Sequence, residues 1–434
     1  MTAPPGDAIA RRTDRFRAES LDQRSPGQRD RDRILYCSAF QRLAKVTQVV
    51  SPDEAQVFHN RLTHSLKVAQ LARRLAEKLV REQPDVVDAV GGVDPDTTEA
   101  AALAHDLGHP PFGHTAEEEL RTRVSEAGLP DGFEGNAQSF RIVTRLAVRF
   151  PDGGLNLTRA TLNALLKYPW KRKPGQRKFG AYESDLEHFD WARAPLPPRD
   201  ERKTAEAELM DWADDVTYAV HDLADFYSAG LIPLDRLSSR KDDAERVRFL
   251  KDVFDVRGKG RELELRHRRQ DLEEAFLSVA KIELPFERFT GTRAQRFRLR
   301  AYTSTMIGRY LGAVRLKVPT STTDRFVEID RELEMQVTML KELTWTYVIE
   351  NPSLVMQQRG HCVVIGELFR IFHEAALGKK NLRLLPPAIR EQLDSASPDP
   401  EARIVADYIA GMTERQALNT FLKLTGVVPG SAFQ

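Results

Sequence analysis

The stretch from Ala100 to Glu119 constrains the fold of this chain more than any other. Its first part, Ala100 to Leu107, predicts the end of an apolar helix, which Gly108 is placed to cap. Pro110 begins a proline pair that prevents this helix from continuing, and a capping-box pattern that starts at Thr115 predicts the next helix. The stretch therefore predicts a short, proline-stiffened loop between two helices.

This loop region is rich in side chains that can bind a metal or move a proton. His105 and Asp106 are adjacent, and His109 and His114 follow within nine residues. In the last turn of a helix, the negative end of the helix dipole favours a cation beside the first pair. A single histidine would most simply be a hydrogen-bonded core residue on an ordinary connector. Four such side chains together favour a metal site or an acid–base site.

Composition narrows the class of protein. The 434 residues allow two or three domains, and a hydrophobic content of 41% is enough for a sizeable core. Lys plus Arg (65) nearly equals Asp plus Glu (64), so a polyanion partner would need a local basic patch. Cys37 and Cys362 are far apart, which predicts a reducing compartment without disulfides. Because no apolar run suits a signal peptide or a membrane span, we expect a soluble, cytoplasmic protein without a membrane partner.

The hydrophobic pattern predicts a mainly α fold, because helical spacing recurs along the chain and sustained strand alternation does not. Residues 1–28 are polar and contain several Pro and Gly residues, which predicts a mobile N-terminal arm. We expect one domain over residues 29–230 and a helical C-terminal region over residues 231–434. Val46 to Val50 predicts a short strand or hairpin arm.

Two long helices are predicted to carry further polar side chains. Thr63 is expected to cap the first, which places His64 in its first turn. The second runs from about Thr204 to Ala229 and has one apolar face. Its opposite face carries an acidic stripe of four aspartates with one tyrosine among them: Asp211, Asp214, Tyr218, Asp222 and Asp225.

Three separated places thus offer metal ligands: His64, the pair His105 and Asp106, and either Asp214 or Asp215. Two imidazoles and two carboxylates suit a borderline divalent ion such as Mn, Fe, Co, Ni or Zn, and Mg less well. Such an ion acidifies bound water and polarises a phosphoryl oxygen. The simpler interpretation makes His64 a surface residue and the acidic stripe a solvated face. Aspartate is a mediocre helix former, however, and its repeated use within a helix favours a cavity.

Longer motifs make the sequence recognisable. The segments HDLGHPPFGH, NRLTHS, FEGNAQ and ADDVTYAVHDLAD resemble the HD-domain superfamily and, within it, the bacterial dGTPase-like deoxynucleoside triphosphate triphosphohydrolases. The resemblance runs from about Arg29 to Asp225. It implies an HD-domain helical fold and a metal-dependent phosphohydrolase domain for residues 29–230, with residues 231–434 as the associated helical region.

The resemblance also implies an activity and its main residues. The activity is hydrolysis of a deoxynucleoside triphosphate (dNTP), dGTP or another, to deoxynucleoside and tripolyphosphate by water attack at the α-phosphorus. One divalent ion, with Mn favoured, would serve each site. The implied catalytic pair is His114, for proton transfer, and Glu117, which orients it. The implied metal ligands are His64, His105, Asp106 and Asp214. Asp214 is preferred to Asp215 because it shares a helical stripe with two further implied site residues.

Those two residues are Tyr218 and Asp222, which the resemblance places near the deoxyribose, where Tyr218 would exclude a ribose hydroxyl. His109 is expected to approach the phosphates. The other implied substrate-binding residues are Gln48, Asn60 and Arg61, by the sugar or phosphate, and Lys178 and Tyr182, in the triphosphate pocket. The family resemblance further suggests a homo-oligomer, a hexamer or tetramer, with a possible allosteric nucleotide or single-stranded DNA as activator.

Two other functions stay open at this point. The chain could be another HD phosphohydrolase, acting on nucleoside monophosphates or cyclic dinucleotides. Alternatively, two basic and aromatic segments, residues 168–180 and 286–302, could make it a single-stranded nucleic-acid-binding protein. A solvated charged surface or an allosteric nucleotide pocket between subunits is the simpler interpretation of both segments.

Overall fold

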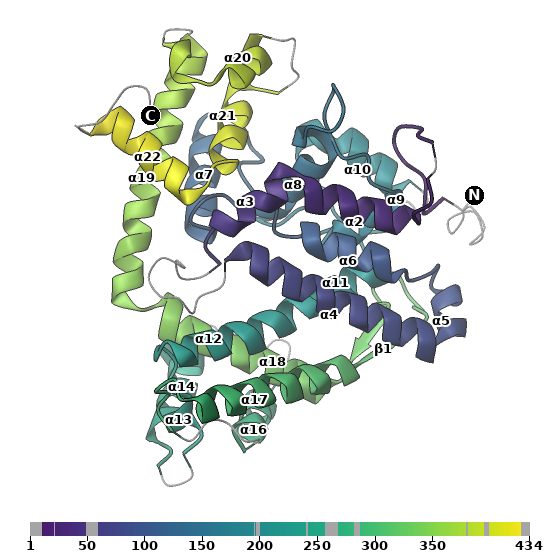
Figure 1. Cartoon of the computed structure of the whole chain (residues 1–434), viewed down its shortest axis with the longest axis vertical. Helices are drawn as coiled ribbons and strands as arrows, with labels where there is room; N and C mark the ends of the chain where they lie inside the picture. The colour runs from purple at the N-terminus through teal and green to yellow at the C-terminus, as the bar shows by residue number, and fades with distance from the viewer. Residues whose placement is uncertain are drawn as a thin grey trace.

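The computed structural model describes residues 11–20, 22–48, 60–194, 196, 200–239, 242–256, 268–281, 287–378, 381–394 and 399–426. Within these ranges the chain is mostly helical and forms one two-stranded sheet (Figure 1), which confirms the predicted mainly α fold. Among the helices in this part of the chain, none combines the length and the apolar character needed to cross a bilayer.

Helix α6 (Pro95–Ala104) lies at the centre of the fold. It packs against α2 (Pro26–Tyr36), α4 (Arg61–Glu82), α9 (Arg159–Leu165) and α11 (Ala205–Thr217). Its last two turns are buried on nearly every side, and their alanines allow the neighbouring helices to approach closely. The C-terminal end of α6, with the residues that follow it, therefore lies inside the protein.

Helix α4 begins before the predicted cap. Asn60, not Thr63, is its N-cap, and the Asn60 Oδ1 atom accepts a hydrogen bond from the Thr63 backbone at 2.9 Å. Asn60 also forms an isolated antiparallel bridge with Thr47, in the segment where a strand was predicted. The rest of that prediction, from residue 49, lies outside the described ranges. The bridge ties the chain before α4 to the first turn of this helix.

Helix α11 continues through a π-helical turn (Tyr218–Asp222) into α12 (Leu223–Ser228), and Thr204 caps its start. The long helix predicted over residues 204–229 is thus present, with one wider turn inside it. π-Helical turns are rare and frequently occur at functional sites. The turn at 218–222 contains Tyr218 and Asp222, which the family resemblance places near the deoxyribose of the substrate.

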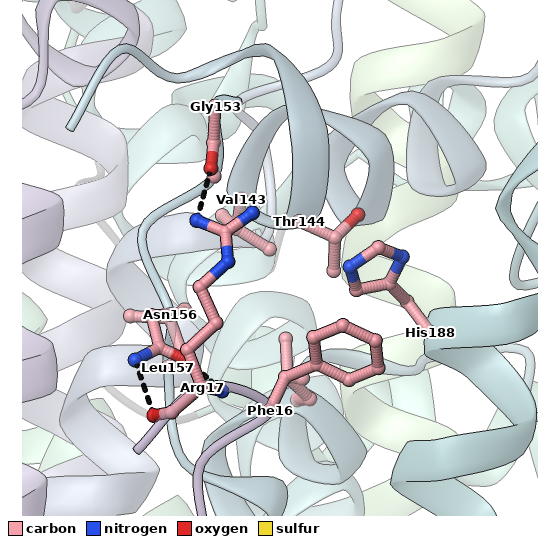
Figure 2. A pocket seen from close by; sticks show the side chains of 10 residues that line it. Phe16, Arg17, Val143, Thr144, Gly153, Asn156, Leu157 and His188 are labelled. Carbon is pink, nitrogen blue, oxygen red and sulfur yellow. Dashed lines mark hydrogen bonds between the residues drawn. The ribbon is translucent and has the colours of Figure 1, made fainter. Parts of the chain in front are cut away.

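The described part of the predicted N-terminal arm is bonded to the rest of the protein. Arg15 donates hydrogen bonds to the Asp30 carboxylate and to the Asn156 carbonyl, both at 2.6 Å. Figure 2 shows Phe16 and Arg17 beside the loop that contains Gly153, and Arg17 Nη1 donates to the carbonyl of that glycine at 2.9 Å. Residues 11–20 are therefore attached to the body of the protein. Residues 1–10 lie outside the described ranges.

The remaining helices of the N-terminal half surround this centre. They are α3 (Ser38–Arg42), α5 (Pro84–Ala89), α7 (His114–Glu126), α8 (Gly135–Arg141) and α10 (Leu186–Arg193). The C-terminal half contains strands β1 (Val314–Leu316) and β2 (Val327–Ile329), which pair antiparallel. Its helices are α13 (Leu234–Leu237), α14 (Ala244–Lys251), α16 (Arg269–Lys281), α17 (Arg293–Gly312), α18 (Arg331–Thr344), α19 (Pro352–Gly378), α20 (Pro387–Asp394), α21 (Glu401–Ala410) and α22 (Glu414–Thr425).

The two larger hydrophobic cores do not separate at residue 230, where a domain boundary was predicted. The first joins helices from both sides of that boundary, from α2 through α18. The second joins Phe112 and α7 to α19, α21 and α22. In Figure 1, α19 runs along one side of the molecule and leads from the lower helices to α20, α21 and α22. The last helices of the chain therefore pack directly beside the loop that precedes α7.

That loop differs from the prediction at its first end. Helix α6 stops at Ala104, so His105 is its C-cap and Asp106 lies in the turn beyond. Gly108 does not adopt a left-handed, capping conformation. A Cβ atom at Gly108 would lie 2.1 Å from the Gly135 carbonyl oxygen, so this glycine allows close packing of α8 against the turn.

The second end of the loop also departs from the predicted capping box. Helix α7 begins at His114, with Gly113 as an N-cap that has a φ of 63°. Thr115 therefore lies inside the helix. Glu118, the acidic residue of the predicted box, bonds the Arg121 side chain instead of a capping backbone amide.

Candidate metal centre

Three of the predicted metal ligands gather at one point inside the protein. His64 lies in the first turn of α4, and His105 and Asp106 follow α6. One ligand atom from each of the three lies within 4.8 Å of the others, and all three side chains are buried. Helices α4 and α6 pack side by side, and this packing brings together ligands that are 41 positions apart (105 − 64).

The fourth predicted ligand reaches the same point from α11. The Asp214 Oδ1 atom lies 3.1 Å from His64 Nε2 and 3.7 Å from His105 Nε2. Asp215, the alternative, lies away from this cluster and accepts a hydrogen bond from Lys341 Nζ of α18 at 2.5 Å. The geometry therefore favours Asp214 as the fourth ligand.

The hydrogen-bonding pattern fits a bound cation. His105 Nδ1 lies 2.7 Å from the Ala102 carbonyl, to which it donates, so the lone pair of a neutral ring is on Nε2. This Nε2 atom is buried and has no hydrogen-bond partner among the residues that the structure describes. A buried nitrogen lone pair beside two carboxylates is unfavourable unless a cation or a proton lies between them. These four side chains can hold one borderline divalent metal ion.

The two carboxylates favour positive charge at this point, whether a proton on His105 or a bound metal ion. Burial by itself would lower the pKa of His105, but the Asp106 and Asp214 carboxylates outweigh it and raise that pKa to about 9. Although burial opposes ionisation, the charge on His105 and neighbouring cations hold the pKa of Asp106 well below its usual range. Both aspartates therefore carry negative charge at neutral pH, and this charge attracts a cation.

Arg61 has a partner within the ligand cluster. Its guanidinium is buried, and Nη1 donates to the Asp106 Oδ2 atom at 2.7 Å. Asn60, expected beside it at the substrate, is the N-cap of α4. Both residues hold the first turn of α4 and the Asp106 carboxylate in place, and the substrate contacts predicted for them stay predictions.

Asp222 lies behind His64, and its predicted place near the deoxyribose stays a prediction. It is buried, and its Oδ1 atom lies 4.0 Å from His64 Nδ1, the ring nitrogen that does not face Asp214. Burial raises the pKa of Asp222 to about 6. At 4.0 Å this carboxylate is too far from the ring for a direct hydrogen bond, and it adds negative charge behind His64. The spacing of eight residues between Asp214 and Asp222 was the sequence signal for this arrangement.

A second cluster contains the predicted proton-transfer residues. His114 Nδ1 lies 3.0 Å from the Glu117 Oε2 atom, and 74% of the His114 side chain is exposed. His109 lies between the two clusters, because its Nδ1 atom is 3.0 Å from Asp106 Oδ1 and its ring is 5.0 Å from that of His114. Burial and the nearby Arg61 cation lower the pKa of His109 to about 4, so its ring is neutral.

Lys178 supports this second cluster. Its Nζ atom donates to Glu117 Oε1 at 3.0 Å and to Glu134 Oε1 at 2.9 Å. Both carboxylates are buried, and 36% of the lysine side chain is exposed. Lys178 therefore holds Glu117, the residue bonded to His114. This role of Lys178 was not predicted from the sequence. Its exposed part lies beside the cluster, where it was predicted to meet the triphosphate.

Tyr182 is a packing residue, not part of an open pocket. It is fully buried, its hydroxyl donates to the Glu134 carbonyl at 3.1 Å, and the Arg403 guanidinium lies 3.5 Å from its ring. Its hydroxyl and its ring face are both occupied by protein groups, and its contact with the triphosphate stays a prediction. Sequence alone does not distinguish a buried tyrosine from one that lines a pocket.

The last two predicted substrate residues remain open to a ligand. The side-chain oxygen of Gln48 is buried, and within the described ranges, which stop at this residue and resume at 60, it has no hydrogen-bond partner. Tyr218 is partly buried in the π-helical turn, and burial raises the pKa of its hydroxyl. Tyr218 is therefore neutral and can pack against a sugar.

The two basic and aromatic segments lie in different settings. Residues 168–180 pack near the second cluster, and Trp170 Nε1 donates to the Lys178 carbonyl at 2.8 Å. The described part of residues 286–302 forms the exposed start of α17, where 71% of Phe297 is accessible. The first segment thus belongs to the candidate site, and the second is a separate surface.

Known proteins share sequence similarity with both halves of this chain. Residues 61–219, which contain all four candidate ligands, match the HD domain, and residues 327–423 match the phosphohydrolase-associated domain. The chain is similar to the "deoxyguanosinetriphosphate triphosphohydrolase-like protein" of Streptomyces coelicolor, with 37% identity over 98% of this chain and 99% of that one. Proteins of the same name from Corynebacterium efficiens (36% identity, 91% and 90% coverage) and Wolinella succinogenes (33%, 95% and 98%) are also similar.

Proposed function

The chain belongs to the deoxyguanosinetriphosphate triphosphohydrolase-like family of HD-domain phosphohydrolases, and from this premise we propose that it hydrolyses a deoxynucleoside triphosphate to deoxynucleoside and tripolyphosphate. The substrate is dGTP or another dNTP. One observation carries the proposal: His64, His105, Asp106 and Asp214 surround one point, next to an exposed His114 that is bonded to a buried Glu117.

The four ligands are proposed to hold one divalent ion, with Mn favoured. Such an ion polarises a phosphoryl oxygen and lowers the pKa of bound water. Asp106 and Asp214 offset its charge, and the buried Asp222 lies 4.0 Å behind the His64 ring. The neutral His109 ring carries its proton on Nδ1, which faces the Asp106 carboxylate, so its Nε2 atom can accept a hydrogen bond from water or from a substrate hydroxyl.

His114 is the proposed proton-transfer residue. Its Nδ1 atom is bonded to Glu117, which leaves Nε2 on the exposed side of the ring. Despite burial, the hydrogen bond from His114 and the charge of Lys178 hold the pKa of Glu117 well below its usual range. The ionised Glu117 accepts the hydrogen bond from His114 Nδ1 and so keeps the Nε2 side of the ring turned outward. When water attacks the α-phosphorus and the bond to the 5′ oxygen breaks, Nε2 can protonate this leaving oxygen.

The test uses the purified chain, each dNTP and Mn²⁺ in H₂¹⁸O. The phosphate product is identified by anion-exchange chromatography and mass spectrometry. We expect tripolyphosphate that carries one ¹⁸O atom, because water attack at phosphorus leaves the new oxygen on the phosphate. Asp106→Ala should abolish both turnover and metal retention, because the site loses a charged ligand. Release of pyrophosphate or orthophosphate, or turnover of nucleoside monophosphates or cyclic dinucleotides alone, would contradict the proposal.

Assembly and activation are separate proposals. As in the family resemblance, we propose a cytoplasmic homo-oligomer, a hexamer or tetramer, that a nucleotide or single-stranded DNA activates. Mass photometry with and without dNTP tests the assembly. The alternative function, single-stranded nucleic-acid binding, draws support from the exposed Phe297 and the arginines around it on α17. Binding of an oligonucleotide by the Asp106→Ala variant, without turnover in the unmodified chain, would favour it.

A further inference from the structure

One carboxylate from the C-terminal end of the chain joins two segments of the candidate active site. The Glu414 Oε1 atom accepts hydrogen bonds from the Thr47 backbone amide at 2.7 Å and from the Phe112 backbone amide at 3.2 Å. Glu414 is the first residue of α22, whose start is fixed by a capping box between Thr413 and Gln416. A capped helix end is a rigid place from which to hold two other segments.

The two amides lie next to the helices that carry the site. Thr47 pairs with Asn60, the N-cap of α4, and His64 follows in the first turn of that helix. Phe112 directly precedes the N-cap of α7, whose first residue is His114. A single oxygen atom of Glu414 therefore links the start of the helix with a metal ligand to the start of the helix with the proton-transfer residue.

The loop at Phe112 needs support from outside. Phe112 has a φ of 66°, in the left-handed region, which is unfavourable for a residue with a side chain. Its ring stacks on that of His361 from α19, with ring centroids 4.0 Å apart and an interplanar angle of 11°. The same loop residue is thus held by its backbone amide from α22 and by its ring from α19.

Arg42 makes a second link among the same three segments. Its Nη2 atom donates to the Leu107 and His109 carbonyls, both at 2.8 Å, and its Nη1 atom donates to the Met412 carbonyl at 3.1 Å. Burial lowers the pKa of Arg42 to about 10, so the guanidinium stays charged at neutral pH. The C-terminal residues 412–414 therefore contact both sides of the candidate active site at two points.

We propose that Glu414 is a positioning residue that sets the separation between His64 and His114 through the backbones of Thr47 and Phe112. The proposal rests on the proposed function for its effect on turnover. Its effect on the two backbone segments does not depend on the substrate. The phosphohydrolase-associated region is then part of the active-site framework, because it supplies the acceptor that the two helix starts share.

Three substitutions at residue 414 separate the roles of the oxygen and of the charge. Glu414→Gln keeps an acceptor oxygen at the same distance from the backbone and removes the charge. Glu414→Ala removes the acceptor. Glu414→Asp keeps the charge and withdraws the oxygen by one methylene, and it serves as the test if the alanine variant does not fold. Arg415→Ala, at the exposed neighbouring position of α22, is the matched control.

The experiment measures kcat and KM for a dNTP with Mn²⁺, together with hydrogen exchange in peptides that cover residues 42–48 and 107–113. For Glu414→Ala we expect kcat to fall by about 10²-fold, the effect of misplacing a catalytic group by about 1 Å. We expect a smaller change in KM and faster exchange in both peptides. Glu414→Asp should resemble the alanine variant, whereas Glu414→Gln and Arg415→Ala should resemble the unmodified chain.

Two results would overturn the proposal. One is a Glu414→Ala variant with unchanged kcat and unchanged exchange in both peptides. The other is a Glu414→Gln variant as impaired as the alanine variant, because charge rather than the acceptor would then matter. If the unmodified chain hydrolyses no dNTP, the proposed function fails by itself. Hydrogen exchange then decides the role of Glu414, since unchanged protection in the alanine variant refutes it and lost protection supports it.

Discussion

The Oδ1 atom of Asp214 lies 3.1 Å from the Nε2 atom of His64, although 150 positions separate the two residues in the chain. Helix α11 packs against both α4 and α6, and this packing places Asp214 opposite the two histidines. A carboxylate oxygen and an imidazole nitrogen at this distance share either a proton or a cation. The contact therefore places Asp214 in the candidate metal centre.

The two adjacent aspartates of α11 should behave differently when substituted. Asp214→Asn should lose metal retention and turnover, because it removes a charged oxygen beside both histidines. Asp215→Asn should keep the metal, because Asp215 is bonded to Lys341 instead. Metal content after dialysis, measured by mass spectrometry, checks this. Loss of metal from the Asp215 variant alone would reverse the assignment.

Lys178 should support both stability and turnover. Lys178→Met leaves the buried Glu117 and Glu134 without their shared cation. Because water screens this partly exposed lysine, we expect a loss of about 1–2 kcal/mol in the free energy of unfolding. We also expect a lower kcat with unchanged metal content. Lys171→Met is the control, since Lys171 pairs with Asp190 on the surface. Equal effects of the two substitutions on kcat would refute a supporting role for Lys178.

Gly108 should be intolerant of a side chain for packing reasons. In Gly108→Ala the new Cβ atom would lie 2.1 Å from the Gly135 carbonyl oxygen, which forces α8 away from the turn after α6. We expect a loss of about 3 kcal/mol in the free energy of unfolding. Gly308→Ala, in α17 with open space around it, should instead gain about 0.5–1 kcal/mol. Denaturant unfolding of both variants checks the contrast, and a stable Gly108→Ala protein would contradict the close approach.

Glu208 should make stability depend on pH. Its Oε2 atom accepts a hydrogen bond from the Val327 amide at 2.7 Å, and burial raises its pKa to about 7, above its ordinary 4.5. Between these two values the folded protein holds a proton that the unfolded chain has released. The contribution of Glu208 to stability therefore falls as pH rises through this interval.

Glu208→Gln keeps an acceptor for Val327 and removes this titration. The thermal midpoint of the variant minus that of the unmodified chain should therefore increase from pH 4.5 to pH 8. Scanning calorimetry at several pH values provides the measurement. A difference that stays constant over this range would show that Glu208 does not titrate in the interval.

Much of the fold and of the ligand set was predictable because its signals are local. Helical spacing over residues 204–229 predicted α11 and α12, and the stripe shared by Asp214, Tyr218 and Asp222 favoured Asp214 over its neighbour. Helix ends were less accurate. Asn60 caps α4 in place of Thr63, because the bridge to Thr47 selects where that helix begins. Gly108 was recognised as special, but its reason is contact with α8 and not local conformation.

The sequence by itself determined which side chains are available and on which helices they lie, because helical periodicity and short motifs are properties of neighbouring residues. Only the tertiary structure decided what each side chain faces. It paired Arg61 with Asp106, buried Tyr182 under Arg403, and joined Glu414 to Thr47 across 367 positions of the chain. Such contacts depend on how helices pack around two hydrophobic cores, and a packing arrangement between distant segments leaves no periodic or local pattern in the sequence.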